Sequence, residues 1–312
     1  MTRIVRVAMT ETINVFPGMP QELSQLDALR DRLGEVRKAN LDHHLTLAAD
    51  AAKVGVRLIG FGELFAGPFF ALARTPMWFD LAEDPQTGPT ISTLRQAARD
   101  HSLIISAPIY ERVSESQRFS TTVLIDESGE LVGKYRKCHL PEGANEEGSF
   151  FEPFYYSKSD GDNGSWAANV SNNPFFPVYQ TSIGKVGLTT CYDRHFPGVM
   201  QTMNAEGAEL VLSPAVTFGE KSRRMWHMEF LVDAMRHNIF IAGSNRRGSE
   251  PPWNQEFFGE SYFAGPNGVV PRLDGTRPEL VVADLDLDEL SRPDPSGWNI
   301  ARDQRPNIYT KS

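Results

Sequence analysis

The chain has 312 residues, of which 40% are hydrophobic and 23% are charged, and its formal net charge at pH 7 is −9. This composition excludes a disordered chain, a collagen and a coiled coil, and the negative charge argues against nucleic acid or an anionic membrane surface as partners. The two cysteines are too few for a disulfide framework, and no apolar run approaches the roughly 20 residues that span a bilayer. We therefore expect a cytoplasmic protein with free thiols.

The first half of the chain alternates between apolar, β-branched runs and segments with helical spacing of apolar residues. The predicted elements are a strand at 4–9, a helix at 26–52, a strand at 56–61, a helix at 91–100 and a strand at 103–109. A hairpin follows, with strands at 121–125 and 131–135 around the turn at 126–129.

The second half continues the alternation. Strands are predicted near 185–188, 210–212 and 239–242, with helices that begin near Phe196 and Arg224. Alternating strands and helices predict an α/β layered fold. No linker or repeat divides the chain, so residues 1–312 are predicted to form one domain.

Two segments depart from this pattern. A polar stretch near 154–177 is predicted to be a surface insertion, which either covers the pocket, meets a neighbouring subunit or is a passive loop. From about residue 292 the chain is rich in proline, and Trp298, Ile300 and Tyr309 predict a tail that docks on the domain.

Several common kinds of site have no motif here. The chain lacks a phosphate-binding Gly-x-x-x-x-Gly-Lys-Ser/Thr loop, a complete dinucleotide fingerprint and a Gly-x-Ser-x-Gly elbow. Neither Cys-x-x-Cys nor His-Glu-x-x-His spacing occurs. The sequence therefore predicts neither a metal nor a cofactor.

Three predicted strands end in reactive side chains. Glu63 follows the strand at 56–61, Lys137 follows the hairpin, and Cys191 follows the strand at 185–188. In open α/β sheets, ligands bind beyond the carboxyl ends of the strands, and active-site residues lie there. Taken singly, each residue has an ordinary alternative: Cys191 as a small buried hydrophobe, Glu63 as a solvated carboxylate and Lys137 as a surface lysine. Spacing along the chain does not show that the three converge.

Together, these three segments resemble the nitrilase superfamily. Glu63 in Gly-Glu-Leu-Phe, Lys137 in Tyr-Arg-Lys-Cys-His-Leu-Pro and Cys191 in Cys-Tyr-Asp-Arg-His-Phe-Pro are similar to its Glu-Lys-Cys triad. Further segments resemble the branch that contains β-ureidopropionase and the N-carbamoyl-amino-acid amidohydrolases; they lie at 225–227, 245–248, 258–262 and 298–300. The resemblance implies an α-β-β-α sandwich whose subunits pair through helices into a four-layer dimer, so the chain is expected to be a homo-oligomer.

The resemblance also implies roles for particular charged residues. The family's lysine stands two residues before a histidine, which selects Lys137 over Lys134. A second glutamate lies downstream in the family, where Glu146 and Glu147 compete. We assign that role to Glu147 from its spacing to residues 151–153.

Arg194 is the clearest indication of the substrate. By resemblance it binds a substrate carboxylate, while the alternative is an ion pair with Asp193 or with a neighbouring subunit. His139 resembles a family histidine that contacts substrate, although a structural histidine is equally expected there. The backbone N–H of Tyr192 is expected to stabilise an oxyanion together with Lys137.

These assignments predict a hydrolase of non-peptide C–N bonds, with Cys191 as nucleophile and Glu63 as general base. The expected substrate is a carboxylated small molecule, an N-carbamoyl amino acid of the N-carbamoyl-β-alanine type. The products would be the amino acid, ammonia and carbon dioxide. The alternatives are an aliphatic amidase or nitrilase of the same superfamily and, more remotely, a catalytically silent binding or scaffold protein.

Overall fold

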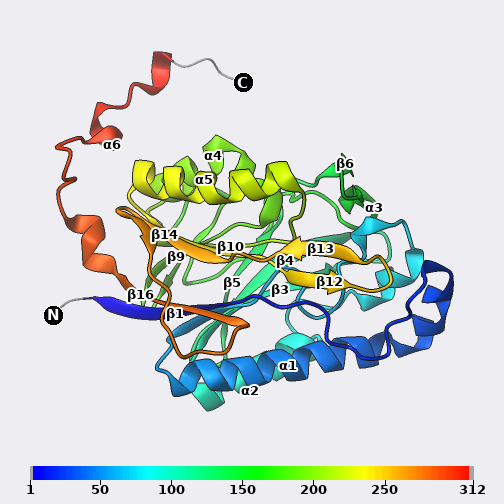
Figure 1. Ribbon diagram of the computed structural model, residues 1–312. Coiled ribbons are helices and arrows are strands. Elements are labelled where there is room, and N and C mark those ends of the chain that lie inside the picture. Colours follow the sequence, from blue (N-terminus) through cyan, green and yellow to red (C-terminus); the bar gives the residue numbers. More distant parts are fainter. Residues whose placement is uncertain (1–2, 309–312) are drawn as a thin grey trace.

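The computed structural model describes residues 3–308, and two six-stranded sheets stacked face to face form its centre (Figure 1). The first sheet has the order β16-β1-β2-β3-β4-β5. Its strands are β1 (Ile4–Thr10), β2 (Leu58–Gly60), β3 (Ile104–Arg112), β4 (Arg118–Ile125), β5 (Leu131–Arg136) and β16 (Leu280–Asp286). Strands β1, β2 and β3 are mutually parallel, and the remaining pairs are antiparallel.

The second sheet has the order β15-β14-β11-β10-β9-β8. Its strands are β8 (Val178–Thr181), β9 (Gly184–Leu188), β10 (Leu210–Pro214), β11 (Phe240–Ser244), β14 (Tyr262–Gly265) and β15 (Gly268–Val270). Strands β9, β10 and β11 are parallel, so their carboxyl ends lie at one edge. That edge carries the segments that follow β9 and β10.

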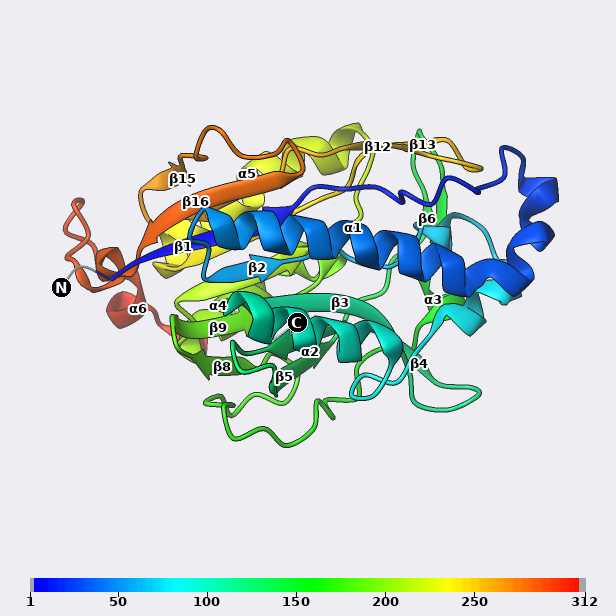
Figure 2. The ribbon, with the colours of Figure 1, turned by 90° about the horizontal axis from the view of Figure 1, so that it is seen from below.

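Helices cover the outer face of each sheet. Figure 2 shows α1 (Leu33–Lys53) and α2 (Pro89–His101) side by side over the first sheet. The second sheet carries α4 (Pro197–Ala205) and α5 (Glu220–His237) on its outer face (Figure 1). Apolar side chains fill the space between the two sheets and between each sheet and its helices. Burial of this surface is the main source of stability.

Shorter elements complete the described chain. Two small hairpins are β6 (Glu142–Ala144) with β7 (Ser149–Phe151), and β12 (Arg247–Glu250) with β13 (Gln255–Phe258). The short helices are α3 (Glu152–Tyr155) and α6 (Ile300–Asp303). Turns of 3₁₀ helix lie at Leu23–Arg32, Phe70–Leu72, Pro76–Leu81, Cys191–His195, Leu287–Ser291 and Pro306–Ile308. None of the helices between residues 3 and 308 has the length and apolar character needed to cross a bilayer.

The predicted α/β class and the predicted order of strands and helices are confirmed up to β11. The long helix predicted from residue 26 differs, because it begins as a 3₁₀ helix and becomes α-helical only at Leu33. The strands after β11 were not predicted. Among them, β16 returns to pair with β1 and completes the first sheet.

The C-terminal tail was predicted to dock, and within the described residues its α6 approaches α5 while its apolar side chains stay exposed. Residues 291–303 are exposed throughout, and Trp298 keeps 69% of its surface accessible. The tail leaves β16 and projects away from the sheets (Figure 1). Because prolines, aspartates and a glycine separate its apolar residues, they form no continuous face for packing. Tyr309 lies outside the described residues.

The insertion at 154–177 runs along an edge strand of each sheet, β5 in the first and β8 in the second. Asn163 is buried within it, accepts the backbone N–H of Arg136 at 3.0 Å and donates to the carbonyl of Pro174 at 2.8 Å. These bonds tie the segment to β5. None of its residues lines the large cavity described below.

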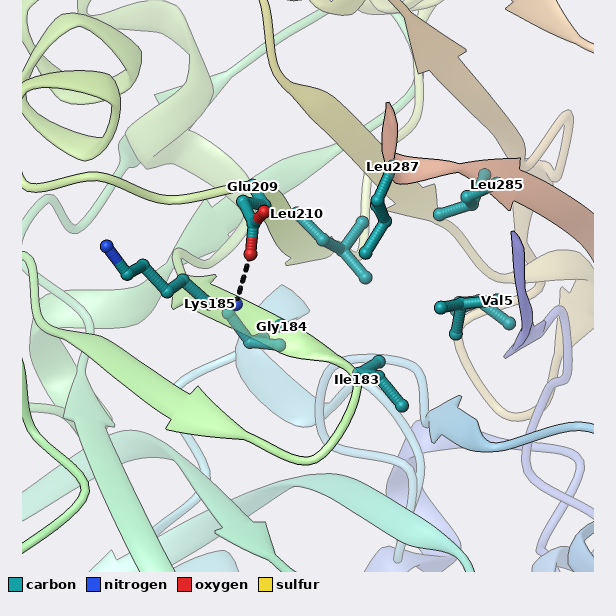
Figure 3. A pocket seen from close by; sticks show the side chains of 10 residues that line it. Val5, Ile183, Gly184, Lys185, Glu209, Leu210, Leu285 and Leu287 are labelled. Atoms are coloured by element: carbon teal, nitrogen blue, oxygen red, sulfur yellow. Dashed lines mark hydrogen bonds between the residues drawn. The ribbon is translucent and has the colours of Figure 1, made fainter. Parts of the chain in front are cut away.

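One gap between the sheets has a volume of only about 10 Å³ (Figure 3). Its walls are mostly apolar and include Val5, Ile183 and Leu287. Beside it, Glu209 accepts the backbone N–H of Lys185 at 2.9 Å. Since this volume holds about one water molecule, the gap is a packing defect and not a ligand site.

Candidate active site

The structure brings Glu63, Lys137 and Cys191 together. They follow β2, β5 and β9, and therefore come from both sheets. Lys137 Nζ donates to Glu63 Oε1 at 3.0 Å. Cys191 Sγ lies within 4.8 Å of a carboxylate oxygen of Glu63. All three side chains are almost fully buried, so one enclosed site combines a thiol, a carboxylate and an ammonium group.

A second carboxylate completes this cluster, and it belongs to Glu152. Lys137 Nζ donates to Glu152 Oε1 at 2.8 Å and lies 2.7 Å from Oε2. Oε2 has no partner besides this ammonium among the described residues, and Glu152 lines the cavity. Glu152 therefore holds the lysine through both oxygens and also borders the space that a ligand would occupy.

The structure corrects the assignment of Glu147 to this role. Glu147 is exposed in the turn of the β6–β7 hairpin and accepts a hydrogen bond from Gln255 at 2.8 Å. Asn145 Oδ1 accepts the N–H groups of Glu147 and Gly148, which fixes a tight polar turn. Turn residues of this kind point to solvent. The sequence does contain a signal for Glu152. This carboxylate directly follows Phe150 and Phe151, and its apolar flanks indicate burial.

Cys191 stands at a strained elbow. Its φ is +51°, a left-handed conformation that non-glycine residues rarely adopt and that is frequent at functional sites. Leu64, directly after Glu63, has a φ of +55°. The Cys191 Sγ–H donates to the carbonyl of Val216 at 3.5 Å.

The electrostatics of the cluster favour a neutral thiol at rest. Burial, followed by the charge of Glu63, raises the pKa of Cys191 to about 12, against the opposing effects of Lys137 and Arg194. Attack by this sulfur requires a base that takes its proton at the moment of reaction.

Lys137 stays charged in this setting. Burial alone lowers the pKa of its ammonium group, but the thiolate form of Cys191 and the carboxylates of Glu152 and Glu63 raise it well above the ordinary value. One positive charge thus sits between two carboxylates. The single positive charge balances the cluster only when one of the two carboxylates is protonated.

Glu152 is the group that accepts this proton. Burial raises the pKa of Glu152 to about 8, with Lys137 opposing the shift and Glu63 adding to it. A glutamate in the unfolded chain titrates near 4.5, so between about pH 4.5 and pH 8 only the folded state is protonated here. The free energy of unfolding contributed by Glu152 therefore falls as pH rises through this window.

This linkage predicts a difference between the wild type and Glu152→Gln, whose amide does not titrate. From about pH 5 to about pH 8, we expect the wild type to lose stability relative to the variant, as measured by urea unfolding at each pH. Glu147→Gln is the matched control and should follow the wild type. A parallel pH dependence in all three proteins would contradict the protonation of Glu152.

A buried aspartate fixes the elbow that carries Cys191. Asp193 accepts the backbone N–H of Thr190 at 3.0 Å, and the Thr190 side chain bonds back in a capping box. The Tyr135 hydroxyl also donates to Asp193. These contacts connect the segment after β9 with β5.

His139 takes part in this support and does not line the cavity. Its Nδ1 lies 2.7 Å from Asp193 Oδ1, and its ring stacks on Phe196 with centroids 3.8 Å apart. The structure thus places His139 in the structural role and not in the predicted contact with substrate. Tyr192, in contrast, lines the cavity as expected of a residue beside the nucleophile.

Arg194 lies at the base of the cavity beside the nucleophile. Its Nη1 donates to the carbonyl of Cys191 at 2.9 Å and lies 3.9 Å from Sγ, and its Nη2 donates to Thr217 Oγ1 at 3.1 Å. The predicted ion pair with Asp193 is not formed in the described chain; the nearest carboxylate is that of Glu229, 3.4 Å from Nε. The five N–H donors of the guanidinium are therefore not all used.

The cavity above these groups has a volume of about 340 Å³. The β6–β7 hairpin forms one wall, and the segments after β9 and β10 with the start of α5 form the other. Phe69, Phe150 and Phe218 supply apolar surface, whereas Lys221 and Glu146 are exposed at the rim. The volume and the few convergent polar groups suit a small-molecule ligand.

Residues outside the predicted set also shape the site. The buried Arg246 donates from Nη2 to the carbonyls of Glu63, Leu64 and Gly67 at 3.2, 2.8 and 2.9 Å. It also pairs with the buried Glu250. Arg246 therefore supports the loop that carries Glu63. In the sequence, Arg246 was marked only by its place after a strand and within the family-like segment 245–248.

The donor atoms of Glu63, Glu152 and Cys191 lie close enough together to hold a metal ion. However, the ammonium of Lys137 already lies between the two carboxylates and satisfies their charge. A cation at this point would face direct repulsion from the lysine. The arrangement is better suited to acid–base and nucleophilic chemistry by the side chains themselves.

Comparisons with known proteins agree with this geometry. A model of the carbon-nitrogen hydrolase family matches residues 33–292. The β-ureidopropionase of Arabidopsis thaliana is 29% identical over 325 aligned residues, which cover 98% of this chain and 72% of that protein. The N-carbamoylputrescine amidase of Oryza sativa is 29% identical over 288 residues, which cover 88% of this chain and 89% of that protein.

The fold also has counterparts among solved structures. The carbon-nitrogen hydrolase from Helicobacter pylori G27 superimposes with a TM-score of 0.78 at 20% identity, covering 98% of this chain and 97% of that one. The match to the family model extends over most of the chain, from α1 to the start of the exposed tail. The chain therefore belongs to the carbon-nitrogen hydrolase family of the nitrilase superfamily and is a hydrolase.

Proposed function

We propose that the enzyme hydrolyses N-carbamoyl amino acids of the N-carbamoyl-β-alanine type, giving the amino acid, ammonia and carbon dioxide. The observation that carries this proposal is the position of Arg194, whose Nη1 lies 3.9 Å from the sulfur of Cys191 at the base of the cavity. A guanidinium so close to the nucleophile pairs well with a substrate carboxylate. The named relatives, which act on N-carbamoyl compounds, support the same reaction type.

The first half of the reaction forms a covalent intermediate. The sulfur of Cys191 attacks the carbamoyl carbon while Glu63 takes the thiol proton. Lys137 and the backbone N–H of Tyr192 stabilise the negative oxygen of the tetrahedral intermediate. The C–N bond to the terminal nitrogen then breaks, and Glu63 returns its proton to the leaving ammonia. Glu152, which borders the cavity beside Lys137, forms a hydrogen bond with this nitrogen and orients it.

The second half releases the product. Glu63 removes a proton from water, whose oxygen attacks the S-carbamoyl carbon. The C–S bond breaks, and the sulfur recovers the proton held by Glu63. The released N-carboxy amino acid loses carbon dioxide and gives the free amine. No cofactor is required for any of these steps.

Ammonia release from purified protein tests this proposal. With a panel of N-carbamoyl-β-alanine, N-carbamoyl α-amino acids, N-carbamoylputrescine, simple amides and a nitrile, we expect turnover of the carboxylated carbamoyl compounds. Cys191→Ala should remove it, because no other described thiol lines the cavity. Arg194→Ala should lower kcat/KM for carboxylated substrates about 100-fold, the loss of one charge-assisted pair.

Other outcomes would redirect the assignment. Turnover of amides or nitriles alone would identify an amidase or nitrilase of the same superfamily. An unchanged preference for carboxylated compounds in Arg194→Ala would contradict the role of this arginine. If the protein releases ammonia from none of the compounds, a binding protein is favoured.

The proposal includes assembly into a dimer through the outer helices of the second sheet. On α5, Met228, Val232 and Met235 are 56%, 46% and 53% exposed and share one face through their spacing of four and three residues. Pairing of two copies would bury this apolar stripe.

This surface gives a test of the dimer. We expect the double variant Val232→Glu/Met235→Glu to be a monomer in light scattering coupled to gel filtration. In a dimer, each subunit would bury two negative charges in the interface. Val113→Glu, which changes an exposed valine between β3 and β4, is the control and should remain dimeric. A wild type that elutes as a monomer would contradict the proposal.

A further inference from the structure

Glu229 joins two residues that line the same wall of the cavity. It lies on α5, where its side chain is 14% exposed, and its Oε1 is 2.7 Å from Nδ1 of His195. Its Oε2 is 3.4 Å from Nε of Arg194. One carboxylate thus bridges two neighbouring basic side chains of the segment that carries Cys191.

His195 is oriented toward ligand by this contact. The residue lines the cavity, and its Nδ1 is bound to Glu229. Within residues 3–308, Nε2 of this ring has no hydrogen-bond partner. When a carboxylate fixes one nitrogen of an imidazole, the other nitrogen is held in a defined direction.

Arg194 is restrained by the same bridge. Its guanidinium lies over the ring of Trp226 at 5.3 Å and is bonded to the carbonyl of Cys191 and to Thr217. However, Nε of Arg194 and Oε2 of Glu229 are both buried without a hydrogen-bond partner, although they lie 3.4 Å apart. This pair is one small displacement short of a hydrogen bond.

We propose that His195 is a second binding group for the substrate carboxylate beside Arg194, and that Glu229 is the positioning residue that holds both. The inference rests on the proposed function, in which the substrate carries a carboxylate. When both ring nitrogens of His195 carry a proton, Nε2 donates to one carboxylate oxygen, and Arg194 donates to the other.

The polar groups of this wall suit a carboxylate. Arg194 supplies a positive charge beside the sulfur, and charge-assisted N–H donors favour a carboxylate over a neutral group. A cationic substrate would lack a partner here.

Kinetics with paired substrates separate this role from a structural one. We expect Glu229→Gln and His195→Gln each to raise KM for N-carbamoyl-β-alanine about 10-fold while kcat changes little. KM for propylurea, which lacks the carboxylate, should stay within about twofold of the wild-type value. The KM of the double variant for N-carbamoyl-β-alanine should not exceed the higher of the two single-variant values, because the two residues act as one unit.

Alkylation of Cys191 provides a readout that needs no substrate. Sulfur displaces iodide from iodoacetate or iodoacetamide, and Glu63 takes the thiol proton. Because only iodoacetate carries a carboxylate, the ratio of its rate to that of iodoacetamide measures anion recognition beside the sulfur. We expect this ratio to fall about fivefold to tenfold in Glu229→Gln and in His195→Gln.

Glu220→Gln is the matched control, since it removes an exposed carboxylate from the same helix outside the cavity. Its alkylation ratio should equal that of the wild type. An unchanged ratio in both test variants, or an equal loss of rate for both reagents, would overturn the inference. If the wild type releases no ammonia from any carbamoyl compound, the proposed function fails, and the alkylation ratio still decides whether His195 and Glu229 recognise a carboxylate.

Discussion

Replacement of Lys137 by glutamine is expected to lower kcat about 1000-fold, whereas replacement of Lys134 should leave it within about twofold of wild type. Lys137 Nζ bonds to Glu63 at 3.0 Å and to Glu152 at 2.8 Å in the centre of the site. Loss of one preorganised oxyanion donor costs about 3–4 kcal/mol in the transition state. Glutamine supplies a neutral donor in its place, which does not compensate for the lost charge.

The same change should weaken folding. Without the ammonium group, two carboxylates remain buried with no cation between them, and removal of one partner from a buried ion pair typically costs about 3–5 kcal/mol. Proton uptake by the carboxylates will offset part of this cost. Urea unfolding at neutral pH will therefore show a lower midpoint for Lys137→Gln.

Lys134→Gln is a close control because it makes the same change three residues earlier. Lys134 pairs with Glu111 at 3.1 Å, and Arg136 also holds Glu111, with an Nη2–Oε1 distance of 2.8 Å. Glu111 thus keeps a cationic partner after the change. Equal activity of the two variants would contradict the assignment of Lys137 as the oxyanion-stabilising group.

Replacement of Glu152 by glutamine is expected to lower kcat about 100-fold, and replacement of Glu147 should have no comparable effect. Glu152 contacts Lys137 with both carboxylate oxygens and lines the cavity. A glutamine side chain has only one acceptor oxygen. Either Lys137 or the substrate N–H must then face an amide donor, which costs about 3 kcal/mol for a buried, charge-assisted contact.

Steady-state kinetics and the binding of a slow substrate analogue distinguish the origin of this loss. We expect kcat to fall more than affinity, because Glu152 orients the nitrogen that leaves during the reaction. Glu147→Gln tests the residue that the spacing of the sequence had favoured. Strong loss of activity in Glu147→Gln with a normal Glu152→Gln would restore the earlier assignment and contradict the geometry.

Much of the fold could be read from the sequence because the signal is local. Strands such as β3 and β10 are buried on both faces, so their residues form continuous apolar runs. Helix α2 carries its buried residues at helical spacing. In contrast, β16 depends on pairing with β1 from the far end of the chain, and no local pattern reveals that partner.

Glu63, Lys137 and Cys191 were selected as candidate catalytic residues from the segments around them. Each follows a strand, and residues at strand ends lie at the edge of the sheet where ligands bind. The motifs therefore sufficed to select the three residues and Arg194. They did not give the distances, which depend on how two separate sheets stack.

Tertiary structure decided between residues that are close in sequence. Glu147 and Glu152 are five positions apart, but the β6–β7 hairpin turns the first to solvent and returns the second to Lys137. His139 lies two residues after Lys137, but its ring contacts Asp193 and does not line the cavity. Side-chain direction at such positions depends on partners contributed by other segments.

The sequence by itself thus determined the α/β class and selected Cys191, Glu63 and Lys137 as candidates, together with the family-like motifs around them, since these reside in short contiguous segments. Only the tertiary structure decided which second glutamate meets Lys137, that burial keeps Cys191 a neutral thiol, and that Glu229 bridges Arg194 and His195. The physical reason is that pKa values and contacts are set by neighbours brought together from β2, β5, β9 and α5, which lie far apart along the chain.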